Sequence, residues 1–120
     1  MKSDRYPDKE YTYAGTSNLQ IRRQAKTEAG VAIDLTGRTG TISARLGSGS
    51  EAVYKIQAQD IAVEAGTDGW WTYTPTAAEV DESGEYNTQA RLVTTVGGAV
   101  YYDEEFILDV LEPIHYVAPA

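Results

Sequence analysis

The stretch from Asp81 to Leu92, "DESGEYNTQARL", decides the fold. A turn with two adjacent acids and a glycine leads directly into a tyrosine, and the residues that follow alternate in character. Tyr86, Ala90 and Leu92 fall on one face of a strand, because successive side chains point to opposite sides. A tyrosine in this setting is typical of a tyrosine corner, whose hydroxyl bonds to backbone a few residues upstream. The stretch therefore predicts that Gly84 and Tyr86 are fold-specifying residues.

The acids of this turn also admit a competing interpretation, a ligand site built on Asp81, Glu82 and Glu85. These three carboxylates lack the alternating oxygen-ligand spacing of a dedicated Ca²⁺ loop. We therefore favour the structural interpretation, in which the acidic turn belongs to a corner between strands.

Period-two alternation continues over most of the chain, with turn sequences about every 8–12 residues. In "TGTISARL", Ile42, Ala44 and Leu46 share one face, which indicates a half-buried strand. "WWTYT" is rich in aromatic and β-branched residues and is also expected to be a strand. Trp70 and Trp71 must then lie on opposite faces, so one of them is expected to point outward.

Two short strands are expected near the start of the chain, at Tyr11–Gly15 and Leu19–Gln24. The segment "TAAEVDESG" is the one helix-like piece. Thr76 can cap it, with Glu79 three residues later completing a capping box. We expect one short helical turn near residues 76–80.

The last third of the chain predicts a hairpin of two long strands, Tyr86–Val96 and Ala99–Leu111. Gly97 and Gly98 separate them, and both can adopt the positive φ angles that a tight turn requires. Four residues of the second strand are expected to face inward: Tyr102, Phe106, Leu108 and Val110. Glu104 interrupts this face, so we expect a bulge or a strand end near Asp103.

These features together predict an all-β fold, an immunoglobulin-like (Ig-like) Greek-key β-sandwich of about 7–9 strands. We expect an N-terminal arm with a first strand in residues 1–15, the sandwich in residues 16–111, and a C-terminal tail in residues 112–120.

The bulk composition narrows the functional class. The chain has 120 residues, with 18 acids against 10 bases and a net charge of −8, which opposes nucleic-acid binding. Cysteine is absent, so disulfides and thiolate metal sites are excluded. The polar start has no signal-peptide h-region, and no run of about 18 apolar residues occurs, so we expect synthesis in the cytoplasm and no membrane insertion.

No catalytic constellation emerges from the residues. The single histidine, His115, lies in the proline-bracketed tail "EPIHYVAPA", where a Ser-His-Asp triad would lack a rigid scaffold. One histidine without cysteine cannot build a zinc centre. The carboxylates of Asp103–Glu105 alternate between strand faces and do not converge. We therefore expect a non-enzymatic protein without metal or cofactor.

Aromatic residues indicate protein contacts instead. Nine tyrosines and two tryptophans stand against one phenylalanine, and Tyr is enriched at protein interfaces. The arms carry aromatic and aliphatic side chains that either order against a neighbouring subunit or leave the arms disordered. The predicted partner-binding residues are Tyr6, Tyr11, Tyr13, Trp71, Tyr73, Ile114 and Tyr116. In the alternative, Trp70 or Trp71 stacks on sugar rings beside Tyr73, as in a carbohydrate-binding or adhesive module.

Two longer stretches, "AIDLTGRTGTISARL" and "DGWWTYTPTAAEVDESGEYNTQARLVTTVGGAVYYDEEFILDV", resemble a small Ig-like domain of tailed-phage proteins. The N-terminal domain of baseplate upper proteins is the named example. The shared elements are an Asp-Leu-Thr-Gly start to a strand, an aromatic strand before a Thr-Ala-Ala turn, and a Gly-x-Tyr start to a long hairpin. The similarity covers roughly Val31 to Val110, about two-thirds of the chain.

This resemblance implies a structural protein of a tailed-phage or prophage virion. A place in the baseplate or tail is the first expectation, and a capsid-attached or head-fibre role is the second. The expected partners are other virion proteins and copies of the chain itself, with a host-surface glycan under the alternative. The expected location is the virion, after synthesis in the host cytoplasm.

Overall fold

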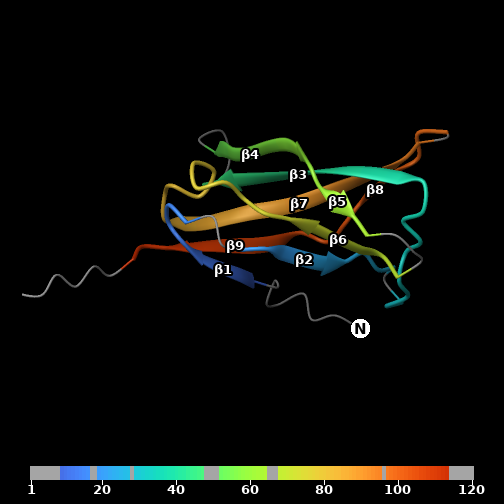
Figure 1. The fold of residues 1–120 in the computed structure, drawn as a ribbon, viewed down its shortest axis with the longest axis horizontal. Helices are drawn as coiled ribbons and strands as arrows, with labels where there is room; N and C mark the ends of the chain where they lie inside the picture. The colour runs from blue at the N-terminus through green and yellow to red at the C-terminus, as the bar shows by residue number, and fades with distance from the viewer. Residues whose placement is uncertain are drawn as a thin grey trace, which may run out of the picture.

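The computed structural model describes residues 9–16, 19–27, 29–47, 52–64, 68–95 and 97–113, and within these ranges the fold is all-β without a helix (Figure 1). Within the described ranges, nine strands form two sheets. The strands are β1 (Lys9–Tyr13), β2 (Ile21–Gln24), β3 (Arg38–Leu46), β4 (Val53–Asp60), β5 (Ala62–Val63), β6 (Trp70–Tyr73), β7 (Gly84–Thr94), β8 (Val100–Tyr102) and β9 (Phe106–Leu111).

The larger sheet has the strand order β1-β9-β7-β3-β4, with β8 also paired to β7. Its pairs are antiparallel except for β1, which runs parallel to β9. The smaller sheet has the order β2-β6-β5 and is antiparallel throughout. Consecutive strands of the chain therefore often lie in different sheets, and Figure 1 shows the smaller sheet lying across the larger one.

The core forms where the alternating apolar faces of the two sheets meet. Ile21 and Trp71 of the smaller sheet belong to one cluster with Ile42, Tyr86 and Phe106 of the larger sheet, and all five are fully buried. On β7 the alternation predicted from "EYNTQARL" is confirmed, because every second residue from Tyr86 to Leu92 is buried. Burying an apolar side chain contributes roughly 1.5–3 kcal/mol, so this interior face stabilises the sheet pairing.

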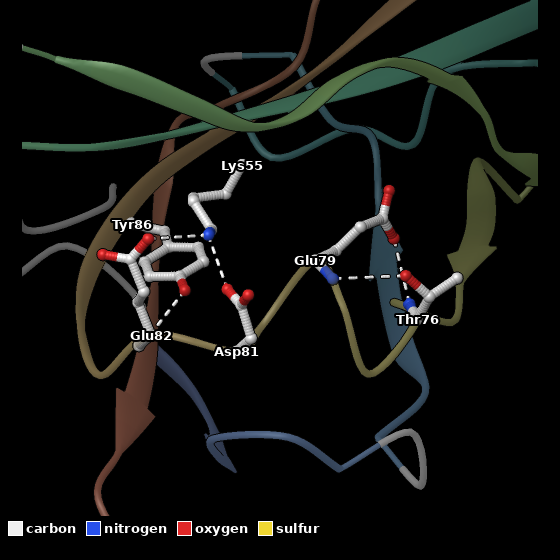
Figure 2. A network of polar contacts seen from close by, with 6 residues as sticks. All are labelled: Lys55, Thr76, Glu79, Asp81, Glu82 and Tyr86. Carbon is white, nitrogen blue, oxygen red and sulfur yellow. Dashed lines mark hydrogen bonds and ion pairs between the residues drawn. The ribbon is translucent and has the colours of Figure 1, made fainter.

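The corner at the start of β7 has the predicted hydrogen bond. Tyr86 is fully buried, and its hydroxyl donates to the carbonyl oxygen of Glu82 at 2.5 Å (Figure 2). Gly84 has a φ of 141°, and a Cβ atom there would lie 2.6 Å from Leu46 Cδ1. The backbone conformation therefore favours glycine at this position, and a larger residue would also have to displace the end of the Leu46 side chain.

The Gly-Gly turn is also confirmed. Gly97 and Gly98 have φ angles of 85° and 66°, and β7 and β8 pair antiparallel on either side of them. The amide of Thr94 donates to the carbonyl oxygen of Ala99 at 3.0 Å and closes the turn.

The strand end expected near Asp103 is present, but it changes which side chains face inward. β8 ends at Tyr102 and β9 begins at Phe106, with residues 103–105 outside both strands. Phe106 is buried as predicted, whereas Tyr102 is 59% exposed, so its inward assignment is wrong. The interruption shifts the alternation, and Asp103 is the buried residue instead.

The helical turn expected near residues 76–80 is a hydrogen-bonded turn and not a helix. The capping-box contacts do form: the Thr76 amide donates to Glu79 Oε1 at 2.9 Å, and the Glu79 amide donates to Thr76 Oγ1 at 3.2 Å. The first turn of a helix fixes several dihedral angles in return for few hydrogen bonds and is therefore unfavourable. Only a longer run of helical residues offsets this cost, and the segment is too short to supply it.

The first strand begins earlier than predicted, at Lys9 instead of Tyr11, and ends at Tyr13. The second starts at Ile21, two residues after the expected Leu19. β1 pairs with β9 along its full length, so the part of the N-terminal arm from Lys9 onward belongs to the larger sheet.

Candidate functional site

The exposed tyrosines of the N-terminal region lie on β1, at the edge of the larger sheet. Tyr11 and Tyr13 are 57% and 53% exposed, while Thr12 between them is buried. This pattern follows from strand geometry, since alternate side chains point to opposite faces. Both tyrosines are therefore available for the contacts predicted for them, although the contacts themselves stay a prediction.

An open pocket adjoins these tyrosines. Its volume is about 350 Å³, and it is lined by Tyr11, Thr12, Tyr13, Leu19 and Leu111. Leu111 is itself 37% exposed. The lining combines aromatic and aliphatic carbon with three hydroxyl groups and has no charge, so it suits an uncharged side chain that is apolar or carries a hydroxyl.

Two ion pairs hold β1 in place, one on each face of the strand. Lys9 Nζ lies 2.8 Å from Glu85 Oε2 on β7, and this carboxylate raises the pKa of the lysine. Arg23 Nη1 on β2 lies 3.0 Å from Glu10 Oε2 and so links the two sheets. The exposed Lys9–Glu85 pair contributes little to stability, and both pairs help to orient the strand.

Three of the predicted contact residues, Tyr6, Ile114 and Tyr116, lie outside the described residues. A fourth, Trp71, requires a correction, because its side chain is 0% exposed. A fully buried ring cannot form part of a contact surface or of a sugar-stacking platform. The alternation of "WWTYT" left open which tryptophan faces the core, and packing against the larger sheet selects Trp71.

Trp71 is fixed in the interior by both packing and a hydrogen bond. Its ring centroid lies 6.4 Å from that of Phe106, with the planes tilted by 43°. Its indole Nε1 donates to Asp103 Oδ2 at 2.9 Å. Asp103 is 5% exposed, and its Oδ1 accepts a bond from the Glu104 amide at 2.8 Å. The carboxylate therefore has donors on both oxygens, which offsets the cost of its burial.

Trp70 points to the outer face of the smaller sheet, where a cation covers it. The Arg22 guanidinium lies 3.9 Å from the centre of the Trp70 ring. Arg22 also binds Glu64 through two hydrogen bonds of 2.7 and 3.0 Å, which lowers the pKa of that carboxyl. One flat face of the indole is thus occupied, and a sugar ring would have to displace the arginine to stack there.

Tyr73 is half-buried and packs against the core cluster. Its hydroxyl donates to the Glu79 carboxylate at 2.7 and 2.9 Å. Burial and this carboxylate both raise the pKa of Tyr73. The residue therefore ties β6 to the following turn, and its polar tip is already engaged within the chain.

The acids considered as a ligand site have cationic partners. Lys55 Nζ of β4 lies 2.5 Å from Asp81 Oδ1 and 3.0 Å from Glu82 Oε1 (Figure 2). The lysine lowers the pKa of Asp81, and the two carboxylates raise its own. Glu85 pairs with Lys9 of β1 and not with Lys55. The three acids do not converge on one point, and the structural interpretation of the corner accounts for them.

Sequence reasoning missed three participants. Leu19 and Leu111 line the β1 pocket, and Leu111 reaches it because β9 pairs with β1 and places Leu111 beside Tyr13. The basic partner of the corner acids, Lys55, lies 26 residues before Asp81 and 27 before Glu82. A lysine within a predicted strand indicates that an acidic partner lies nearby. The sequence cannot say which acid this is before the strand order is known.

Metal-ligand side chains do not gather in the part of the chain that the structure describes. Within those ranges no group of three or more histidine or acidic side chains could hold a metal ion. The same ranges contain no helix that is long and apolar enough to cross a membrane.

Comparison with known proteins adds no relative. No protein-family model matches the chain, and no curated protein sequence does so either.

Proposed function

We propose that this chain is an Ig-like β-sandwich that serves as a non-enzymatic structural protein of a tailed-phage or prophage virion. It assembles through protein–protein contacts in the baseplate or tail, or on the capsid. The observation that carries the proposal is the pair of exposed tyrosines beside an uncharged pocket on the edge strand of a two-sheet body.

The strand order supports the Ig-like assignment. If the strands are lettered A′ (β1), B (β2), C (β3), C′ (β4), D (β5), E (β6), F (β7) and G (β8 and β9), the sheets are A′GFCC′ and BED. Ig-like sandwiches divide their strands between sheets in this manner, and they carry a tyrosine corner at the start of strand F. Tyr86 occupies this place on β7.

The contact chemistry supports assembly. Tyr11 and Tyr13 combine large apolar area with a polar tip, the property that enriches tyrosine at protein interfaces. They project from a strand held on both sides by ion pairs, so little ordering entropy is lost on docking. The phage assignment itself rests on the sequence resemblance between Val31 and Val110.

Particle association tests this proposal. Virions are purified from a host that carries the gene and analysed by quantitative mass spectrometry and by electron microscopy with an antibody against the chain. We expect several copies per particle at one defined location. Purified virions that lack the chain would refute the virion role, whatever the chain's oligomeric state in solution.

The glycan-binding alternative has less support. Of its two candidate rings, Trp71 is buried and Trp70 lies under Arg22. A glycan array with the wild-type chain and a Trp70→Ala variant distinguishes the two roles. Binding that is lost in Trp70→Ala would favour the adhesive module over the assembly role.

A further inference from the structure

The outer edge of β1 has backbone groups that no described strand pairs. The Ala14 amide donates to the Leu111 carbonyl oxygen at 2.8 Å, so the even-numbered residues of this segment direct their N–H and C=O groups toward β9. Because the direction alternates along a strand, Lys9, Tyr11 and Tyr13 direct theirs away from the sheet. β1 ends the strand order of the larger sheet among the described residues. Such an edge is a template for an added strand.

One end of this edge is already closed. The Tyr13 carbonyl oxygen accepts bonds from the Thr16 amide at 3.2 Å and from Thr16 Oγ1 at 2.7 Å. The N–H and C=O groups of Tyr11 remain the central pairing positions. Beside them lies the pocket lined by Leu19 and Leu111, which contains no charged side chain. A strand added here would place alternate side chains against that pocket.

The chain contains a segment with matching length and chemistry. Five residues, Ile114–Ala118, stand between Pro113 and Pro119, and β1 also has five residues. Proline lacks the N–H that a ladder needs, so the two prolines limit strand pairing to the stretch between them. The segment carries no acid, lysine or arginine, which suits an uncharged pocket. Ile114 and Tyr116 would share one face of a strand.

A second copy can supply this segment more readily than the same chain. Past Leu111 the described chain leaves the sheet in line with β9 (Figure 1). To reach the outer edge of β1, the same chain would have to cross two strand spacings, about 9–10 Å, and reverse its direction within Glu112 and Pro113. The turn at residues 14–16 is hydrogen-bonded back to Tyr13 and lies at the same end of β1, so the chain would also have to pass around this turn.

We propose that the segment Ile114–Ala118 of a second copy adds as a strand to the outer edge of β1, with Ile114 and Tyr116 against the pocket. This arrangement rests on the proposed assembly role and gives it a mechanism. Main-chain hydrogen bonds supply affinity and the pocket supplies selectivity, as in other strand-addition complexes. The donor segment and the acceptor edge are different parts of the chain, so a reciprocal exchange closes a two-fold dimer, and a one-way exchange builds a ring or an open array.

The oligomeric state of the full chain tests the inference first. Sedimentation velocity over a range of concentrations compares the wild type with an Ile114→Ser/Tyr116→Ser variant and with a His115→Ser/Val117→Ser control. We expect wild type and control to self-associate, and the first variant to associate roughly a hundredfold more weakly, since two large apolar side chains leave the pocket. Equal association of all three proteins would overturn the inference, and so would a wild type that stays monomeric.

A peptide measurement identifies the acceptor edge. A synthetic peptide of residues 112–120 is titrated into the Ile114→Ser/Tyr116→Ser chain and into the same chain with Tyr11→Pro, which removes an outward N–H and leaves the β1–β9 bonds in place. Binding to the first protein and at least tenfold weaker binding to the second supports the edge. Absent binding, or equal binding to both with unchanged thermal unfolding, overturns it. Virions that contain the chain while the peptide fails to bind would leave the proposed function intact and remove only this inference.

Discussion

Replacing Tyr86 by phenylalanine removes one hydroxyl and leaves the buried ring in place. The lost interaction is the 2.5 Å hydrogen bond to the Glu82 carbonyl oxygen. A hydrogen bond of this kind contributes about 0.5–1.5 kcal/mol net. The Glu82 side chain is largely exposed, so water can reach the neighbourhood of the freed carbonyl, and the full penalty of a buried unsatisfied acceptor does not apply. We expect Tyr86→Phe to lower the free energy of unfolding by about 1–1.5 kcal/mol.

Thermal and urea unfolding measure this effect. For 120 residues the entropy of unfolding near 60 °C is about 250 cal/mol/K, so the midpoint temperature should fall by about 4–6 °C. The urea m-value should stay unchanged, because the surface exposed on unfolding is the same. Tyr102→Phe is the matched control, since Tyr102 is 59% exposed and its change should stay within about 0.5 kcal/mol.

The comparison of the two tyrosines decides whether the corner stabilises the fold. A Tyr86→Phe protein that unfolds within about 1 °C of the wild type would refute the reasoning, because the hydroxyl would then contribute nothing. An equal loss in both variants would refute it as well, since the effect would not depend on the corner.

Three further perturbations have expected outcomes. Gly69 and Gly97 have nearly equal φ angles of 81° and 85°, but a Cβ at Gly69 would meet backbone carbonyl oxygens at 2.6 and 2.9 Å, whereas none lies near Gly97. Gly97→Ala should therefore cost about 1 kcal/mol and Gly69→Ala at least twice as much, and equal midpoints in urea would contradict the steric account. Trp71→Phe should cost about 2–3 kcal/mol, because it leaves a void and removes one of the donors to the buried Asp103 carboxylate; a cost below about 1 kcal/mol would contradict this. The pKa of Asp81 is lowered from 3.8 by Lys55, so the stability from this carboxylate is present above that pH and is lost as the pH falls through the lowered pKa. Lys55→Met should make the loss of stability below about pH 4 shallower, and an unchanged acid limb in urea titrations would argue against the pairing.

Local patterns predicted much of the fold. The corner tyrosine, the Gly-Gly turn and the buried face of β7 depend on period-two geometry and on φ angles, and each is confirmed. The capping contacts of Thr76 and Glu79 also follow from residues three apart, although no helix grows from them. Such features need no knowledge of distant segments.

The candidate site was less predictable, because its residues come from segments far apart. The exposure of Tyr11 and Tyr13 agrees with their predicted role, but the pocket beside them exists only because β1 pairs with β9 and brings Leu111 alongside Tyr13. The pattern of "WWTYT" is symmetric for Trp70 and Trp71, and it could not indicate which ring is inside.

The sequence by itself determined that this chain builds alternating strands, where they turn, and which tyrosine closes the corner. Only the tertiary structure decided that Trp71 is the buried tryptophan, that the break at residues 103–105 turns Tyr102 outward, and that β1 forms an edge of the larger sheet. The physical reason is the sequence separation of the residues involved. Strand geometry repeats every two residues and depends on neighbouring residues, whereas burial and edge position depend on which distant strands pair and pack.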